Sequence, residues 1–364
     1  MVQLARCMLD RCDAEKNDTE VIQLLQRALD AENRQAFGVL GQCYLEGTGV
    51  AKDDKEGIKL LRKGVGLSDN HSMVVLGRYL IEANEEKEGI NLVQKAAEAD
   101  ESEAMIQLGM YYEVGKGVSK DTEVALSWYR KAAELNDEVA MVKIGRRYLV
   151  GLDVKRDGVE ALKWFTRAAE LGSTKAMCLC FKQLLEGEGI EKNEAAAVKW
   201  GMRAADLGDP IAMRNLASCY SKGVGIAKDW NQATQWLERA AKLNDVKACI
   251  MLAGCYMNGE GVPKDEIKAF QYYRRAAERS DKLAMYCVGQ CYEEGNGVSL
   301  NLSEATKWYR KSADLGSVDS MQALSLCYSV GKGVPMNLAE AEKWRKKAEE
   351  QEAKEKGAII QTGK

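Results

Sequence analysis

Histidine, the side chain most often used as a general base, occurs once in this chain, at His71. A single histidine leaves a histidine-based triad or a multi-histidine metal site out of reach, and we interpret it as an exposed turn residue. Cys178 and Cys180 are one residue apart and no second pair follows, so their spacing does not predict a zinc site. Carboxylates are abundant, but no pair stands out. The sequence therefore predicts no catalytic residue, no metal and no cofactor.

Glycine-rich turns offer a second kind of chemistry, because a Gly-x-Gly turn between a strand and a helix can hold a phosphate. Gly115-Lys116-Gly117 is one such turn. It follows a helical pattern instead of a strand, it lacks the rest of the phosphate-loop signature, and equivalent turns occur eight times. We interpret these turns as structural.

Cysteine is the remaining reactive side chain, with eleven copies in the chain. Six of them recur at one position of a repeated unit, namely Cys7, Cys43, Cys219, Cys255, Cys291 and Cys327. Neighbouring helix axes lie about 8–10 Å apart, whereas the Cα atoms of a disulfide lie within about 7 Å. We therefore expect reduced thiols that serve as small packing residues, which favours the cytoplasm or the nucleus.

The element that positions all these residues is a 36-residue unit, clearest in residues 104–139. Further copies follow without insertion, beginning at Ala140, Ala176, Ala212, Ala248, Ala284 and Ser320. With Ala104 as position 1, apolar or small residues occupy positions 1, 2, 5, 6 and 9, which is one face of a helix. A second helix has a similar face at positions 22, 25, 26, 29 and 30. Each unit is therefore predicted to be a pair of helices.

Capping residues mark the ends of these helices at fixed positions. Position 18 is always aspartate or asparagine, which suits the start of the second helix: Asp53, Asp121, Asp157, Asn193, Asp229, Asp265, Asn301 and Asn337. Position 34 has the same role for the next first helix: Asp69, Asp137, Ser173, Asp209, Asp245, Asp281 and Ser317. Position 12 is glycine in eight copies and position 14 in seven, with Asp153 as the exception. These glycines shape the turn inside each pair.

Position 25 is aromatic in each of the last seven copies, and we interpret this column as buried core. Its members are Trp128, Trp164, Trp200, Trp236, Tyr272, Trp308 and Trp344. A single helix pair cannot bury such faces, but stacked pairs can, with each pair contacting mainly its neighbours. The pattern predicts an all-α solenoid of antiparallel helix pairs.

The L-G-x-x-Y first helix, the G-x-G-V turn and the A-x-x-W-Y-x-x-A-A second helix resemble Sel1-like repeats, relatives of the tetratricopeptide repeat. The resemblance covers nearly the whole chain and implies a right-handed α-solenoid that is an adaptor or scaffold, usually without catalysis. A secreted cysteine-rich subfamily joins the second helix to the next first helix by disulfides. On the second-helix side of that turn this chain has alanines instead: Ala132, Ala168, Ala204 and Ala240.

The unbroken period predicts a single solenoid over residues 1–355, followed by a flexible tail at 356–364. About ten repeats are expected: 1–35 (a degenerate N-terminal cap), 36–71, 72–103 (four residues short), 104–139, 140–175, 176–211, 212–247, 248–283, 284–319 and 320–355 (ending in a C-terminal cap).

Composition limits the compartment and the partners. The net charge of −3 is too small to suggest a nucleic-acid binder. No apolar run approaches the roughly 18 residues of a membrane span, and the first residues do not resemble a secretory signal. We expect a cytoplasmic or nuclear protein without membrane insertion. The oligomeric state does not follow from the sequence.

The surface of the first helix is where a partner is expected to bind. Positions 3, 4, 7, 10 and 11 fall on the arc opposite the core, and the resemblance implies that this helix lines the concave side. The candidate partner-binding residues on this arc are Lys143, Arg146, Lys182, Arg214, Ile250, Met251, Met257 and Tyr286. Arg147, which lies beside the arc, is also a candidate. They would suit a peptide with acidic and apolar residues. The alternative is a solvated face with scattered charge.

These features favour a non-enzymatic scaffold that binds other proteins or peptides along the concave face. Two alternatives stay open on the same fold. One is a small-molecule-binding or hydrolytic, β-lactamase-like Sel1-repeat protein. The other is an adaptor subunit of a membrane-associated protein quality-control complex.

Overall fold

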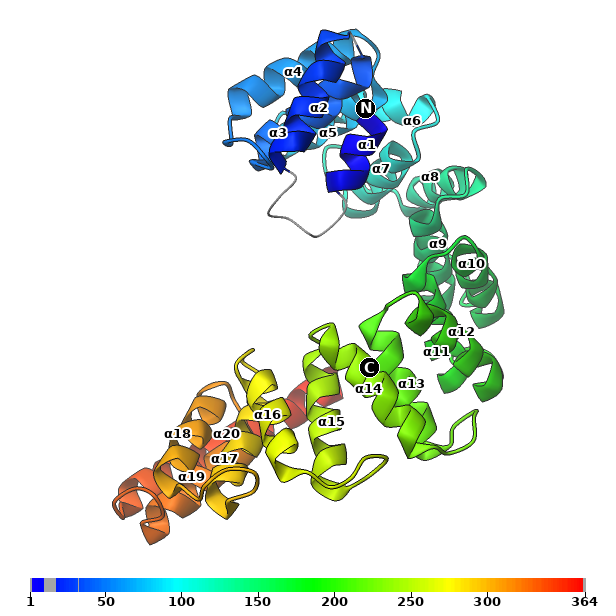
Figure 1. Cartoon of the computed structure of the whole chain (residues 1–364). Helices are drawn as coiled ribbons and strands as arrows, with labels where there is room; N and C mark the ends of the chain where they lie inside the picture. Colours follow the sequence, from blue (N-terminus) through cyan, green and yellow to red (C-terminus); the bar gives the residue numbers. More distant parts are fainter. Residues whose placement is uncertain (1, 10–17, 32, 363–364) are drawn as a thin grey trace. The chain divides into compact units, whose positions relative to one another are not determined.

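The computed structural model describes residues 2–9, 18–31 and 33–362, and this part of the chain contains α-helices and no β-strand (Figure 1). The helices are α1 (Val2–Leu9), α2 (Asp18–Asp30), α3 (Arg34–Glu46), α4 (Asp54–Gly66), α5 (Asn70–Glu82), α6 (Glu86–Glu98), α7 (Ser102–Val114), α8 (Thr122–Glu134), α9 (Glu138–Val150), α10 (Gly158–Glu170), α11 (Thr174–Glu186), α12 (Glu194–Asp206), α13 (Pro210–Lys222), α14 (Trp230–Lys242), α15 (Val246–Asn258), α16 (Glu266–Ala277), α17 (Lys282–Glu294), α18 (Leu302–Asp314), α19 (Val318–Val330) and α20 (Leu338–Thr362). The predicted all-α solenoid of helix pairs is confirmed.

The pair α7 and α8 shows how the sequence sets one repeat. Helix α7 ends at Gly115, whose backbone is left-handed and whose N–H donates to the carbonyl of Tyr111 at 2.8 Å. Such a backbone favours glycine because it has no Cβ. Helix α8 begins after Asp121, whose carboxylate accepts a hydrogen bond from the Val124 N–H at 3.0 Å. The predicted cap and turn residues therefore define this helix pair.

The same caps recur along the chain. Every predicted position-18 side chain accepts a backbone N–H at the start of a second helix. At position 34 the side chains of Asp69, Asp137, Asp209, Asp245, Asp281 and Ser317 do so for the first helices. These predictions are confirmed at the residues named.

Large rings and glycines pack together between the two helices of a repeat. The side chains of Tyr129 and Phe165 are fully buried, and Tyr309 is 1% exposed. A Cβ added at Gly145 would lie 2.5 Å from the Phe165 ring, and one added at Gly109 would lie 2.6 Å from the Tyr129 ring. Glycine at position 6 therefore lets the ring at position 26 approach the facing backbone.

The aromatic column at position 25 is less buried than the sequence predicts. Trp344 is 4% exposed, but the other members, including Trp164 and Trp200, are only half-buried. A Lys or Arg three residues later lies over the ring of each of the six tryptophans in the column, which follows from the spacing of residues on one helix face. The pairs are Trp128–Lys131, Trp164–Arg167, Trp200–Arg203, Trp236–Arg239, Trp308–Lys311 and Trp344–Lys347.

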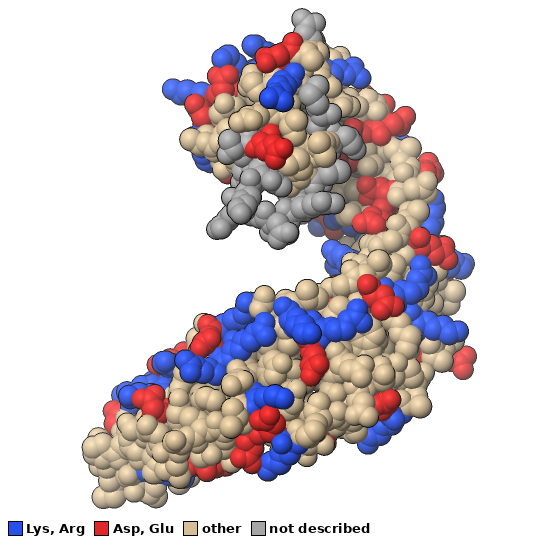
Figure 2. Space-filling view, in the orientation of Figure 1, with Lys and Arg blue, Asp and Glu red and all other residues tan. Residues whose placement is uncertain are grey.

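In the repeats that carry Tyr129, Phe165 and Tyr309, the core ring is at position 26, and the ring at position 25 lies at its edge, shielded by a cation; in the last repeat the buried ring is Trp344 at position 25. In the second unit, defined below, Figure 2 shows Lys and Arg gathered along one edge of the surface over the region of α14 to α18. Helices α14 and α18 each carry one of the stacked cations, Arg239 and Lys311.

Two compact units divide the chain. The first comprises Met1–Ala176 with Glu188–Ile190, and the second comprises Met177–Gly187 with Glu191–Lys364. From α1 to α10 in the first unit, and from α12 to α20 in the second, helices that follow one another in the chain pack against one another. Among the described residues, no helix combines the length and the apolar character needed to cross a membrane.

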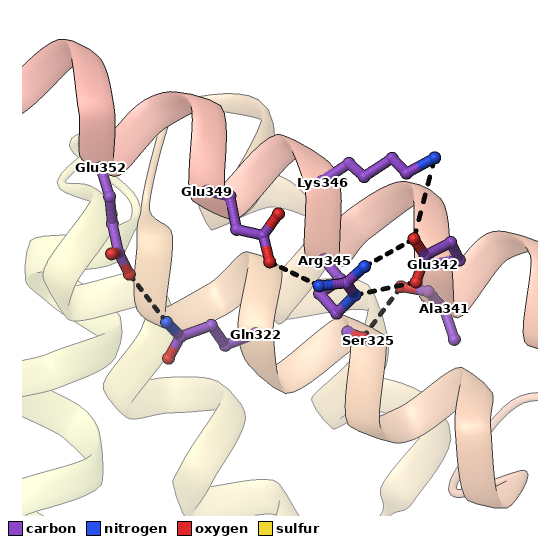
Figure 3. Close-up of polar contacts among 8 residues, drawn as sticks. All are labelled: Gln322, Ser325, Ala341, Glu342, Arg345, Lys346, Glu349 and Glu352. Atoms are coloured by element: carbon purple, nitrogen blue, oxygen red, sulfur yellow. Dashed lines mark hydrogen bonds and ion pairs between the residues drawn. The ribbon is translucent and has the colours of Figure 1, made fainter.

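Helix α20 closes the second unit. Its inner face buries Ala341, Trp344 and Ala348, and its outer face carries ion pairs between Arg345 and the carboxylates of Glu342 and Glu349 (Figure 3). The sequence predicts a flexible tail from residue 356, but the helix continues to Thr362. Residues 363–364 lie outside the described part.

Candidate functional site

The predicted groove residues fall into two groups, which the structure assigns to different units. Lys143, Arg146 and Arg147 lie on α9 in the first unit. Lys182, Arg214, Ile250, Met251, Met257 and Tyr286 lie on α11, α13, α15 and α17 in the second unit. We describe each group within its own unit.

Lys143 and Arg146 line a pocket of about 290 Å³ in the first unit. Val139 and Val142 contribute its apolar wall, and Ser173 and Lys175 lie on the neighbouring segment at the start of α11. Lys143 is half-buried, and its Nζ lies 5.3 Å from the centre of the Tyr129 ring. The structure therefore brings two of the predicted cations to one cavity and adds a third, Lys175, that the sequence reading missed.

The charge of this pocket is not balanced within it. Burial lowers the pKa of Lys143, and the positive charges of Arg147, Lys175 and Arg146 lower it further, against the opposing effect of Glu113. Glu138 is the carboxylate among the lining residues. A negatively charged group would relieve this repulsion, which makes the pocket suited to an anion.

Arg147 is not an exposed binding residue, contrary to the expectation. Its side chain is 4% exposed and forms ion pairs with Glu113 at 3.0 Å and Asp153 at 2.8 Å. The guanidinium also lies 5.2 Å from the centre of the Tyr129 ring. Burial of a charge requires such partners, so Arg147 joins two consecutive repeats instead of facing a ligand.

The guanidinium of Arg214 is also bound by a carboxylate of the chain, that of Asp245. Its Nη1 donates to both carboxylate oxygens of Asp245, at 2.9 and 2.8 Å, and both side chains are largely buried. Lys182 differs, because it is exposed and its contact with Glu186 is a long one of 3.8 Å across one helical turn. Exposed pairs of this kind contribute little to stability, so Lys182 is available to a partner whereas Arg214 is not.

The apolar candidates lie on α15 and α17. Met251 is 37% exposed, and Ile250, Met257 and Tyr286 are half-buried. Tyr286 also lines a second pocket of about 290 Å³ between α17 and α19, together with Gln290 and Leu326. These helices therefore present partly uncovered apolar side chains at the predicted positions.

The second pocket has an acidic wall that sequence reasoning did not single out. The Tyr309 hydroxyl donates to Glu293 at 2.5 Å, and Lys332 forms an ion pair with the same carboxylate. Burial alone would raise the pKa of Glu293, but the hydrogen bonds from Lys332 and Tyr309 hold it below its ordinary value. Glu293 is thus a charged structural link between successive repeats.

His71 and the cysteines provide no reactive cluster in the described part. His71 is half-buried in the first turn of α5, not in an exposed turn, and its Nε2 lies 3.1 Å from Oε1 of Gln42. No group of three or more potential metal ligands occurs among the described residues. Burial raises the pKa of the Cys178 thiol to about 12 and that of Cys255 to about 11, and a protonated thiol is a poor nucleophile.

We expect every thiol to be reduced in the purified protein. None of the nine cysteines with described side chains is in a disulfide, while the side chains of Cys7 and Cys12 lie outside that part. Alkylation without prior reduction, followed by mass spectrometry, should modify all eleven cysteines after unfolding. A defined disulfide that joins neighbouring repeats would contradict this prediction.

Comparisons with known proteins identify the repeat. The sequence profile of the Sel1 repeat matches residues 39–68, 102–137, 139–173, 175–209, 210–245, 246–281, 282–317 and 318–352. These matches cover well over half of the chain. A comparison with curated proteins finds no match.

Solved structures share the architecture. A Sel1 repeat protein from Oxalobacter formigenes is 28% identical, with a TM-score of 0.70 over 84% of this chain and 91% of that chain. A protective antigen of uropathogenic Escherichia coli with a Sel1-like repeat fold is 25% identical, with a TM-score of 0.61 over 90% of this chain and 79% of that chain. Sel1 repeat proteins are commonly protein-interaction scaffolds. The repeat profile and the shared fold together establish that the chain belongs to the Sel1 repeat family.

Proposed function

We propose that the chain is a non-enzymatic scaffold that binds a segment of another protein along the first helices of its repeats. The observation that carries this proposal is the partly uncovered apolar surface formed by Ile250, Met251 and Met257 on α15 and Tyr286 on α17. Methionine and tyrosine on rigid helices suit adaptable contacts with a peptide. The helices of the repeat hold these side chains in place before a partner arrives.

Charge supports an acidic partner segment. Lys143, Arg146 and Lys182 extend from first helices and are not held by a close, buried carboxylate. Arg147 and Arg214 are not included in the contact surface, because their guanidinium groups are taken by carboxylates of the chain. Described cysteines that form no disulfide favour a reducing compartment, the cytoplasm or the nucleus. No specific observation favours the hydrolytic or the quality-control alternative.

The double change Met251→Glu and Met257→Glu tests the apolar surface. We expect it to weaken binding of the partner at least tenfold, or about 1.4 kcal/mol, because it places two charges where the partner buries apolar groups. The partner is first captured from the native source with the wild-type chain and identified, and its affinity is then measured by calorimetry.

The matched control is Ile267→Glu with Leu300→Glu. These residues are 60% and 63% exposed, more than Met251, and they lie in the same unit but outside the first helices. The control should bind as the wild type does. Equal affinity of all three proteins, with unchanged melting, would show that this surface is not the binding site.

A further inference from the structure

The boundary between repeats at the start of α11 lacks the acidic cap residue that most other boundaries have, as the boundary before α19 also does with Ser317. At the start of α11 the capping position 34 holds Ser173, whereas aspartate holds it at the start of α5, α9, α13, α15 and α17. The pocket of about 290 Å³ described above lies at this boundary, with Lys143, Arg146 and Lys175 among its lining residues.

The boundary before α15 shows what an aspartate does at position 34. Asp245 caps the helix by accepting the Ala248 N–H at 2.6 Å, and it also binds the guanidinium of Arg214 on the preceding first helix. One carboxylate therefore has two roles, the cap and the counter-charge. Serine can cap a helix equally well, but it carries no charge and cannot take the second role.

The three cations at Ser173 accordingly outnumber the carboxylates that line the pocket. In the described part of the chain, none of Lys143, Arg146 and Lys175 forms an ion pair, and Glu138 is the carboxylate lining the pocket. Burial is the main cause that lowers the pKa of Lys143; Glu113 opposes it, and the positive charges of Arg147, Lys175 and Arg146 lower the pKa further. Desolvated like charges are unfavourable unless an anion joins them.

We propose that this pocket binds an oxyanion, a carboxylate or a phosphate, carried by the partner polypeptide that occupies the first-helix surface. The inference rests on the proposed scaffold function and names the chemistry of one contact. Arg146 and Lys175 supply donors at the rim, Lys143 supplies a half-buried charge, and Val139 faces the apolar part of the bound residue. The volume is below that of a drug-sized ligand site and fits one or two side chains.

The test uses two nearly isosteric changes at one position. Ser173→Asp should place a carboxylate at the pocket, as Asp245 does beside Arg214. That carboxylate would take the place of the partner's oxyanion. Ser173→Asn should cap α11 equally well without adding charge. The full-length variants differ from each other only in that charge, which makes Ser173→Asn the matched control.

The probes are three fluorescein-labelled peptides of the form Gly-Ser-Ala-Leu-X-X-Ala-Leu-Ser-Gly, with X as glutamate, phosphoserine or glutamine. Binding is measured by fluorescence anisotropy at low salt. For wild type and Ser173→Asn, we expect at least one acidic peptide to bind about tenfold or more tightly than the glutamine peptide. For Ser173→Asp this preference should disappear. Preference for glutamate or for phosphoserine identifies the source of the oxyanion.

Melting temperatures give a readout that needs no peptide. Without ligand, Ser173→Asp should melt above Ser173→Asn, and salt should reduce the difference because it screens charge. The proposal is overturned if the acidic peptides show no preference in wild type, or if the two variants bind them equally. Such a failure leaves the scaffold proposal intact, because the Met251 and Met257 test concerns the second unit and the natural partner.

Discussion

Replacing Phe165 by alanine is expected to lower the free energy of unfolding by about 3–5 kcal/mol, the range for truncation of a fully buried ring. Phe165 is 0% exposed, and its ring lies against Gly145, where no side chain is present to fill the vacated space. The two helices that surround the ring are held by caps at both ends. The cavity should therefore persist, and its cost adds to the lost burial.

Trp164→Ala is the control, because it removes a larger ring from the preceding position of the same helix. Trp164 is half-buried, and Arg167 covers its outer face with the guanidinium 5.7 Å from the ring centre. We expect a loss of only about 1–2 kcal/mol, since less apolar area returns to water. Urea unfolding followed by circular dichroism measures both changes.

Because repeat proteins can unfold in part, a second measurement must show which helices lose stability. Native-state hydrogen exchange should show faster exchange in α9 and α10 for Phe165→Ala than for wild type. A loss for Trp164→Ala that equals or exceeds that for Phe165→Ala would contradict the assignment of position 26 as the core.

The fold could be predicted from the sequence because its determinants lie within single repeats. A cap such as Asp121 bonds to Val124, three residues away, and the turn glycine Gly115 bonds to Tyr111. Such local signals are readable without knowing what packs against the repeat. The exposure of Trp164 was not predictable in this way, because the two aromatic positions 25 and 26 are adjacent and only the stacking decides which one faces the core.

The candidate site was harder to predict because its charges are set between repeats. Arg214 and Asp245 are far apart in the sequence, and no single-helix pattern shows that they meet. One signal could have been used for Arg147. It stands where six copies have cysteine, Asp153 stands where seven copies have glycine, and the two exceptions in one repeat bind each other at 2.8 Å.

Gly297→Ala should also strongly destabilise the chain. Its φ of +70° is a backbone conformation that costs a non-glycine residue about 1–2 kcal/mol. In addition, a Cβ there would lie well inside van der Waals contact of the carbonyl oxygen of Glu266, in the first turn of α16. Because that atom is backbone, no rotamer change can relieve the clash, and overpacking adds about 1–3 kcal/mol. We expect a total loss of roughly 2–5 kcal/mol from the two causes together.

Gly295→Ala separates the cost of the left-handed backbone from the cost of the clash, because Gly295 has the left-handed backbone but no close neighbour. Its φ is +80°, but an added Cβ would meet Leu300 at 3.6 Å, an ordinary contact. Asp153 occupies the position equivalent to Gly297 in another repeat with φ of +61°, so the left-handed backbone by itself is tolerated there. The free energy of unfolding, measured by chemical unfolding, should therefore be lowest for Gly297→Ala, higher for Gly295→Ala and highest for wild type. If the two alanine variants were equally stable, the close approach of neighbouring repeats would not be what requires glycine at this turn position.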